Sequence, residues 1–320
     1  MKPLPLLVVA GPTASGKTAL AVALAERLDT EIISADSMQV YRGMALGTGA
    51  PSAEELARVR HHFIGCLDPS EQFSAGAFGA AGRAVVERLW AEGRTPVVAG
   101  GSGLYVRALT DGLFEGPARV ASVRARLHRE AGERGLAALY ERLQAVDPDY
   151  AARIRPADER RIVRALEVAE TTGKPFSQLH REAEVPPLPA VYVGLDYPRS
   201  ELYARIDRRV AEMVASGFAE EVRALVDAGH GDRLRTLRAL GYREFMDYLA
   251  GASSLDEAQA AMQQVTRRFA KRQLSWWRGD ARMHWIPTRD GVPPEQHADA
   301  VLRIYADAAE AFTSGASSSP

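Results

Sequence analysis

Residues 11–18 read GPTASGKT and fit the phosphate-binding pattern G-x-x-x-x-G-K-[S/T]. In such a loop, small residues let successive backbone N–H groups converge on phosphate oxygens, the lysine adds a point charge, and the threonine hydroxyl can bind Mg2+. An apolar segment precedes the loop and an alanine-rich segment follows it, which is the strand and helix context that the pattern requires. We therefore predict phosphate binding by the whole loop, with Thr18 as the Mg2+ ligand: Gly11, Pro12, Thr13, Ala14, Ser15, Gly16, Lys17 and Thr18.

The loop alone does not identify the phosphate compound, although ATP or another nucleotide is the usual ligand of this class. Nucleotide hydrolases commonly have a strand that ends in an aspartate for Mg2+. Here the apolar segment 95–99 runs into Gly100, Gly101 and Ser102, and the sequence has no guanine-reading NKxD pattern. These absences weaken an ATPase or GTPase interpretation and leave a kinase of a small molecule open.

The stretch ISADSMQVYRGM, residues 33–44, places Asp36 at the carboxyl end of an expected strand. Asp36 is a candidate acid–base residue, and the equally weighted alternative is that Asp36 and Ser37 cap a turn. A carboxylate is a weak base that works when the proton becomes acidic during the reaction, as on an amine that attacks a developing carbocation. Gln39 has donor and acceptor groups that could read a base edge, or it is an ordinary exposed glutamine.

A second glycine-rich segment, AGGSGLY at residues 99–105, carries the hydroxyl of Ser102. This hydroxyl could donate to an oxygen of a leaving diphosphate and stabilise the charge that appears there. The alternative is a tight turn that needs small residues, and taken alone this alternative is favoured.

Three segments are rich in basic residues, although the formal net charge of the chain is only −1. Residues 264–279 contain five basic residues and no acid, and the other two segments are 159–166 and 238–244. Cationic faces can hold phosphates, and aromatic or arginine planes stack on bases for about 1–3 kcal/mol each. A solvated amphipathic helix is the alternative. On the helix that contains the first segment, Ala258, Met262, Val265, Phe269 and Trp276 should form one buried apolar stripe.

Apolar strand segments alternate with helical segments through the first hundred residues, which predicts an α/β fold with a parallel sheet covered by helices. Ligands should gather at the carboxyl ends of its strands. The predicted strands are 4–10, 31–34, 95–99 and 190–196, and the predicted helices are 17–28, 79–92, 202–225 and 255–278.

The pattern changes near Asp111 to arginine-dense helical segments that end in the VPPLP stretch before residue 190. We interpret 112–189 as a helical insertion into a core formed by 1–111 and 190–313, with a disordered tail at 314–320. The net charge of −1 gives no overall attraction to nucleic acid or membranes. The single cysteine, Cys66, favours a cytoplasmic protein without an internal disulfide. No apolar stretch reaches the roughly 18 residues that a membrane span needs.

Taken together, the sequence resembles the tRNA dimethylallyltransferase (tRNA isopentenyltransferase) family. The ordered motifs that carry the resemblance span most of the chain: GPTASGKT, ISADSMQVYRGM, HHFIGCLDP, GGSGLY, ERRIVRALEV, TGKP, LYARIDRRV, ALGYRE and AKRQLSWWR. This series is far more specific than the glycine loop by itself, and it favours the functional interpretations of Asp36, Gln39 and Ser102.

The resemblance implies transfer of the dimethylallyl group from dimethylallyl diphosphate to N6 of the adenosine 3′ to the anticodon of tRNA, with Mg2+. It also implies a P-loop kinase-like core with a helical insertion. By matched motif, Lys17 and Thr18 would hold diphosphate and metal, Asp36 would accept the N6 proton, Ser102 would stand where many members have threonine, and Arg209 would neutralise diphosphate charge.

The same resemblance implies that the anticodon stem–loop of tRNA is the partner, and we expect a monomer that does not bind membranes. The residues that we assign to RNA contact are Asp36, Ser37, Met38, Gln39, Arg160, Arg161, Arg164, Arg238, Tyr242, Arg243, Arg267, Lys271, Arg272, Gln273, Trp277 and Arg278.

The chain departs from the family pattern in two places. Many members read DIGTAKP where residues 45–51 read ALGTGAP, so an acid and a lysine are missing, and many read HHLID where Gly65 ends HHFIG. The departures put in doubt the contacts of those side chains and leave the reaction class unchanged. The competing interpretations are a small-molecule or nucleotide kinase, a non-catalytic RNA-binding protein, and an enzyme that prenylates free adenine nucleotides.

Overall fold

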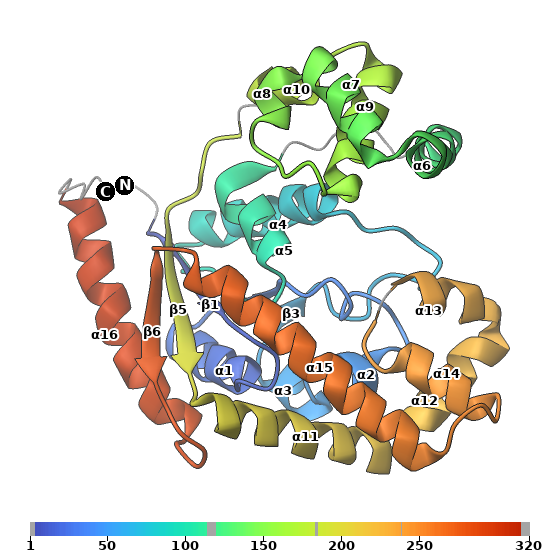
Figure 1. Cartoon of the computed structure of the whole chain (residues 1–320). Helices are drawn as coiled ribbons and strands as arrows, with labels where there is room; N and C mark the ends of the chain where they lie inside the picture. The colour runs from blue at the N-terminus through green and yellow to red at the C-terminus, as the bar shows by residue number, and fades with distance from the viewer. Residues whose placement is uncertain (1–3, 114–119, 183–184, 238, 315–320) are drawn as a thin grey trace. The chain divides into compact units, whose positions relative to one another are not determined.

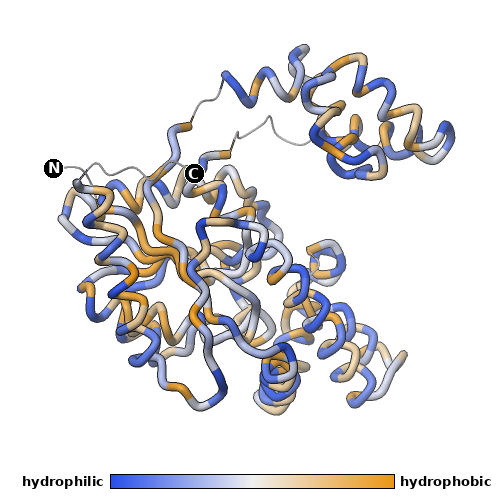
Figure 2. Tube along the Cα trace, turned by 60° about the vertical axis from the view of Figure 1, so that its left-hand side comes forward, coloured by the Kyte–Doolittle hydropathy of each residue, from blue (hydrophilic) through white to orange (hydrophobic). Residues whose placement is uncertain are grey.

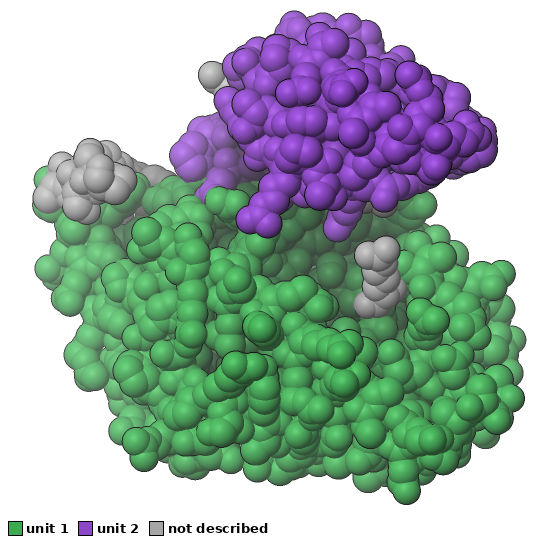
Figure 3. Space-filling view, viewed as in Figure 1, with its two compact units in different colours: residues 1–110, 188–320 green, residues 111–187 purple. Residues whose placement is uncertain are grey.

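The computed structural model describes residues 4–113, 120–182, 185–237 and 239–314. Arg238 and all but the first residue of the tail expected at 314–320 lie outside these ranges. The chain divides into two compact units, which are drawn in different colours in Figure 3. The first unit consists of residues 1–110 and 188–320, and the second consists of residues 111–187.

The first unit contains a six-stranded sheet with the strand order β3-β2-β4-β1-β5-β6, and every neighbouring pair is parallel. Figure 2 shows apolar stretches along the central strands, as expected for a sheet that is buried on both faces. The predicted α/β class with a parallel sheet is therefore confirmed. The strands are β1 (Leu6–Ala10), β2 (Ile32–Ser34), β3 (His61–His62), β4 (Val97–Gly100), β5 (Ala190–Asp196) and β6 (Met283–Pro287).

The register of this sheet brings three candidate segments to one edge. Ala10 pairs with Gly100, and Ser34 pairs with Ala99, so β1, β2 and β4 end at the same level. The glycine loop follows β1, Asp36 follows β2, and Ser102 follows β4. Segments that are far apart in the sequence therefore meet at the carboxyl edge, where ligands of parallel sheets bind.

Helices of the first unit pack on both sides of the sheet (Figure 1). A predicted helix at 202–225 is in fact two helices, because Gly217 adopts a left-handed φ of 98° after α11. The helices are α1 (Lys17–Arg27), α2 (Ala45–Thr48), α3 (Ala53–Arg58), α4 (Ala75–Ala91), α5 (Gly103–Arg107), α11 (Arg199–Ala215), α12 (Phe218–Leu225), α13 (Gly231–Leu237), α14 (Tyr242–Leu249), α15 (Leu255–Arg278) and α16 (Pro294–Thr313). There are also two π-helical turns: η2 (Val226–His230) belongs to the first unit, and η1 (Ala108–Gly112) begins in the first unit and ends in the second.

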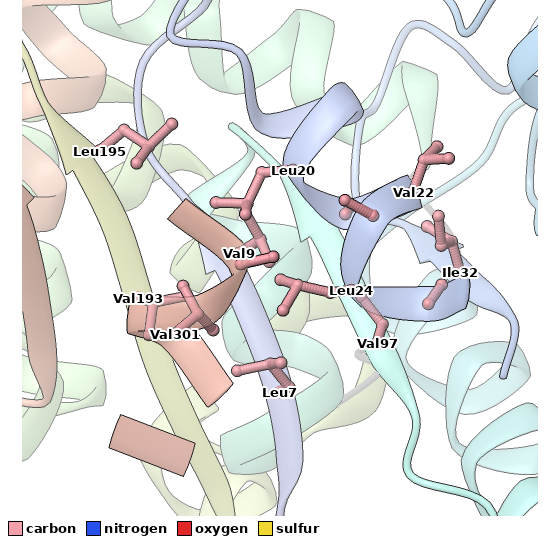
Figure 4. Packing of buried hydrophobic residues seen from close by; sticks show 14 of the residues in the cluster. Leu7, Val9, Leu20, Val22, Leu24, Ile32, Val97, Val193, Leu195 and Val301 are labelled. Atoms are coloured by element: carbon pink, nitrogen blue, oxygen red, sulfur yellow. The ribbon is translucent and has the colours of Figure 1, made fainter. Parts of the chain in front are cut away.

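The core beneath the glycine loop fixes both of the elements that flank the loop. Val9 of β1 and Leu24 of α1 belong to one buried apolar cluster that also includes Val193 of β5 and Val301 of α16 (Figure 4). Both Val9 and Leu24 are fully buried. Because burying such a side chain stabilises the fold by about 1.5–3 kcal/mol, the strand end and the helix start are held in place on either side of the loop.

The buried stripe of α15 differs from the predicted one. Of the predicted members only Ala258 and Met262 are buried, while Trp276 is 38% exposed. The observed stripe consists of Ala258, Met262, Thr266, Ala270, Gln273 and Trp277. Two of these residues are polar, and hydrogen bonds satisfy both of them: Thr266 Oγ1 donates to the carbonyl of Met262, and the bonds of Gln273 are described below. The inward side of α15 therefore includes a polar residue, Gln273, that forms hydrogen bonds to other segments of the chain.

The second unit is helical and has its own apolar core. Its helices are α6 (Ala121–Arg134), α7 (Leu136–Val146), α8 (Pro148–Ala151), α9 (Glu159–Thr172) and α10 (Phe176–Glu182). Leu127, Leu139, Leu143 and Ile162 are fully buried in one cluster. Within the described part of the chain, none of the helices in either unit combines the length and apolarity that crossing a membrane requires.

Candidate active site

The glycine loop adopts a conformation that leads directly into α1. Gly16 caps the helix with a left-handed φ of 84°, and Ala14 also has a positive φ of 62°, which is uncommon for a residue with a Cβ. The Ser15 hydroxyl donates to the carbonyl of Pro12 at 2.9 Å and is buried. This internal bonding holds the loop in a defined shape at a helix N-terminus, where the backbone dipoles favour an anion.

Two cationic side chains converge on this loop. Lys17 Nζ donates to the carbonyl of Pro12 at 2.5 Å, and Arg209 of α11 reaches Thr13 Oγ1 at 3.5 Å and the carbonyl of Gly49 at 3.1 Å. The pKa of Lys17 is lowered to about 7, mainly by burial and also by the charge of Arg209, whereas the charge of Asp36 acts in the opposite direction. Burial also lowers the pKa of Arg209. Two partly buried cations that repel each other form a site that an anion would stabilise.

Asp36 is half-buried, and its Oδ1 accepts hydrogen bonds from the backbone N–H groups of Met38 at 2.9 Å and Gln39 at 3.4 Å. The turn-capping interpretation is therefore correct for one carboxylate oxygen. The other oxygen has no hydrogen-bond partner among the described residues. Asp36 also acts electrostatically on both Lys17 and Arg209, which places its charge beside the cationic loop.

A backbone hydrogen bond joins Ser102 to Ala35, the residue before Asp36. The N–H of Ser102 donates to the carbonyl of Ala35 at 3.3 Å, and Ser102 is the residue immediately before α5. The hydroxyls of Ser102 and of Thr18 form no hydrogen bond with any described residue. The structure therefore brings together a cationic loop, a carboxylate and two available hydroxyls, all from segments that the sequence singled out.

Gln39 is engaged inside the protein. Its Nε2 donates to the carbonyls of Gly49 at 3.0 Å and Thr48 at 3.4 Å, and its Oε1 accepts from Ser34 Oγ at 3.0 Å. Both donor hydrogens of the amide are used, so the expectation that Gln39 reads a base edge does not fit this conformation. The side chain instead supports the segment that carries the Gly49 carbonyl.

Three further residues assigned to RNA contact are buried, which corrects that assignment for direct contact. Trp277 is fully buried in the core, whereas its neighbour Trp276 is exposed. Tyr242 is fully buried, and its hydroxyl donates to Glu221 at 2.7 Å. Gln273 is only 6% exposed. Their aromatic or amide character suggested an RNA surface. Tyr242 lies instead on the buried side of α14, and Gln273 and Trp277 lie on the buried side of α15.

The exposed members of the predicted RNA set lie on three helices. On α14 and α15 they include Arg243, Lys271 and Arg272, while Arg278 pairs with Asp196 at 3.1 Å and Arg267 pairs with Asp207. In the second unit Arg160 and Arg161 of α9 are exposed, and Arg164 pairs with Glu167 at 2.9 Å. Ser37 and Met38 are partly buried in the turn after β2.

Sequence reasoning missed the residues that anchor segment 45–51. The carboxylate of Glu221 accepts the backbone N–H groups of Leu46 at 2.8 Å and Gly47 at 3.0 Å. At Gly49, which has φ 57°, a Cβ would overlap with the guanidinium of Arg209. The only signal in the sequence is the pair of glycines in ALGTG, and this signal does not name the partners.

Comparison with known proteins decides the family. The family model described as IPP transferase matches residues 39–280. The chain belongs to the IPP transferase family. It is 46% identical over 284 residues to a tRNA dimethylallyltransferase of Geobacter sulfurreducens, covering 88% of this chain and 91% of the relative. It is 48% identical over 300 residues to one of an Anaeromyxobacter species, covering 93% and 98%.

Solved structures support the same family. A tRNA isopentenylpyrophosphate transferase from Bacillus halodurans aligns with a TM-score of 0.71 and 38% identity, covering 97% of this chain and 98% of the other. A eukaryotic dimethylallyltransferase acting on tRNA aligns with a TM-score of 0.77 and 25% identity, covering 95% and 80%. These neighbours share the P-loop-like core expected for the IPP transferase family.

For this member of the IPP transferase family, we expect the binding of inorganic pyrophosphate to weaken as the pH rises above about 7. The protonated form of Lys17 prevails below its pKa of about 7, and a bound anion favours that form. Each pH unit above the pKa should therefore cost up to about tenfold in affinity. Titration calorimetry at a series of pH values measures this dependence.

Lys17→Arg is the matched control for the pH series. A guanidinium stays charged throughout this range, so the variant should retain only the pH dependence that comes from the titration of pyrophosphate itself. An identical pH dependence in the wild type and in Lys17→Arg would contradict the role of Lys17.

We expect Gly49→Ala to weaken pyrophosphate binding by about 10- to 100-fold. The new Cβ would displace the guanidinium of Arg209, and a hydrogen bond to a charged group contributes about 1.5–3 kcal/mol. Gly65→Ala is the control, because Gly65 has φ 55° and no heavy atom lies within 4 Å of its Cβ position. Equal losses in the two variants would mean that backbone strain, not Arg209, is responsible.

Proposed function

We propose that this enzyme transfers the dimethylallyl group from dimethylallyl diphosphate to N6 of the adenosine 3′ to the anticodon in tRNA, giving N6-isopentenyladenosine and diphosphate. The observation that carries the proposal is the cationic glycine loop beside Asp36 and Ser102 at one edge of the sheet. The names of its relatives, tRNA dimethylallyltransferases, support the donor and the acceptor.

The main catalytic task is to stabilise the leaving diphosphate. As the bond between the allylic carbon and the diphosphate oxygen breaks, the electron pair leaves with the oxygen. Lys17, Arg209 and the loop amides oppose this negative charge, and the Ser102 hydroxyl donates to a diphosphate oxygen. Donors that are already in place cost no reorganisation when the charge appears, which is why such sites contribute strongly to catalysis.

Asp36 would complete the transfer as the base. The lone pair of N6 forms the new bond to the allylic carbon, and the amine then loses a proton to the carboxylate. One oxygen of Asp36 is held by the turn, so the carboxylate has a fixed orientation, and the other oxygen remains available.

The residues of the loop fit a magnesium ion that is carried largely by the diphosphate. Among the described residues, no group of three His, Cys, Asp or Glu side chains could hold a metal. Mg2+ commonly takes one or two protein ligands together with substrate phosphates and water, and the available Thr18 hydroxyl at the start of α1 fits that role. When bound, the ion would neutralise charge on the leaving group.

The partner in this proposal is the anticodon stem–loop of tRNA, bound by a monomeric cytoplasmic enzyme. The exposed Lys271, Arg272 and Arg243 of the first unit, and Arg160 and Arg161 of the second, would contact its phosphates. Reaching N6 requires the base to leave its stack at a cost of a few kcal/mol, and phosphate contacts offset that cost.

The proposal is tested by incubating the enzyme with radiolabelled dimethylallyl diphosphate, Mg2+ and tRNA that lacks the modification, without ATP. We expect label on N6 of the adenosine 3′ to the anticodon, identified by nucleoside analysis. If no tRNA gains label while ATP is consumed with small acceptors, a kinase function replaces this one. Salt-sensitive tRNA binding without any transfer would indicate a non-catalytic RNA-binding protein.

We expect Asp36→Asn to lower the transfer rate by about 10²- to 10⁴-fold and to retain pyrophosphate binding. Asparagine keeps the oxygen that accepts from Met38 N–H and removes only the charge, so this variant separates the base from the turn cap. Asp36→Ala removes both and serves as the comparison. An Asp36→Asn enzyme that transfers at the wild-type rate would refute Asp36 as the base.

A further inference from the structure

Ser102 lies between two glycines that are covered by side chains of a single helix. A Cβ at Gly101 would overlap with the amide nitrogen of Gln273, and a Cβ at Gly103 would overlap with the indole nitrogen of Trp276. Both side chains come from α15. The glycines on either side of Ser102 are therefore explained by close packing of α15 as well as by the turn.

Gln273 joins this turn to the phosphate loop. Its Oε1 accepts the backbone N–H of Thr13 at 2.8 Å, and its Nε2 donates to the carbonyl of Gly101 at 3.0 Å. The side chain is buried, and the two hydrogen bonds use both ends of one rigid amide. A single planar group thus fixes the distance between Thr13 of the phosphate loop and Gly101, the residue before Ser102.

Trp276 covers the other side of the turn. Its indole packs over Gly103, and the guanidinium of Arg107 lies 5.3 Å from the ring centroid. Residues three apart on a helix lie on neighbouring parts of its surface, so Gln273 and Trp276 reach Gly101 and Gly103 together. Ser102 is held between these contacts, with a hydroxyl that no described residue binds.

We propose that Gln273 and Trp276 are positioning residues that set the hydroxyl of Ser102 against the diphosphate of the donor. The proposal rests on the function given above for Ser102. It also links two parts of the reaction, because the exposed side of the same helix carries Lys271 and Arg272. One side of a single helix would then position the Ser102 hydroxyl, which donates to the leaving diphosphate, and the other side would contact tRNA.

The kinetic test measures single-turnover transfer at saturating donor for Gln273→Ala and Trp276→Ala, each alone and combined with Ser102→Ala. We expect Ser102→Ala to lower the rate by about 10²-fold, Gln273→Ala by about tenfold and Trp276→Ala by about threefold. In the Ser102→Ala background the other two substitutions should change the rate by less than about twofold, because residues that act through one group are not additive. Full additivity would overturn the proposal.

Gln259→Ala is the matched control. Gln259 lies on the same helix, about 21 Å from Gln273 by the helical rise, and this substitution should leave the rate unchanged. Trp276 is exposed, so Trp276→Ala keeps the test available if the buried Gln273→Ala enzyme unfolds. Thermal unfolding of each variant shows whether the fold is retained.

A second measurement does not depend on the reaction. Hydrogen exchange followed by mass spectrometry should show faster exchange in residues 100–106 of Gln273→Ala and Trp276→Ala than in the wild type, with Gln259→Ala unchanged. Unchanged exchange in both variants would overturn the positioning role. If the wild type shows no transfer at all, the proposed function fails, and the exchange result still decides whether α15 holds this turn.

Discussion

The candidate active site depends on the balance of charge around the phosphate loop, residues 11–18. Lys17 and Arg209 lie at the same phosphate loop; burial lowers the pKa of both, and the carboxylate of Asp36 is near enough to oppose that lowering. A cationic pair of this kind is unfavourable in the free protein and becomes favourable when a diphosphate binds. The packing of β1, α1 and α11 maintains this arrangement, so part of the folding free energy is used to keep a binding site ready.

Local sequence patterns predicted the elements that this loop requires. The apolar run of β1, the glycine loop, the strand β5 and the helix α15 are all found at or near the expected residues. The short strand β3, the strand β6 and the helix α16 were not anticipated. β3 has only two residues, and β6 has no fully buried residue. Patterns of this kind are too short or too mixed to distinguish from loops.

Contacts between distant segments account for what the sequence could not predict. The inward side of α15 was misassigned because Gln273 is buried to bond Thr13 and Gly101, which lie 260 and 172 residues away. The missing acid in segment 45–51 raised doubt about that segment. The structure supplies a carboxylate from Glu221, 175 residues further on, and the buried Tyr242 hydroxyl donates to it. Neither partner follows from the local motif, since periodicity carries no information about which segments meet.

The end of β4 shows why this P-loop core does not follow the hydrolase pattern. A strand-terminal aspartate would need a Cβ, and at Gly100 a Cβ would overlap with the carbonyl of Ala35. That carbonyl also accepts the N–H of Ser102, so the close approach of β2 and β4 that excludes a side chain at Gly100 is the same approach that places Ser102 beside Asp36. In the proposed reaction, the hydroxyl of Ser102 serves the departure of the diphosphate, and the carboxylate of Asp36 accepts the proton that the attacking amine loses. The close approach of two backbone segments thereby excludes a strand-terminal aspartate at Gly100 from this edge of the sheet.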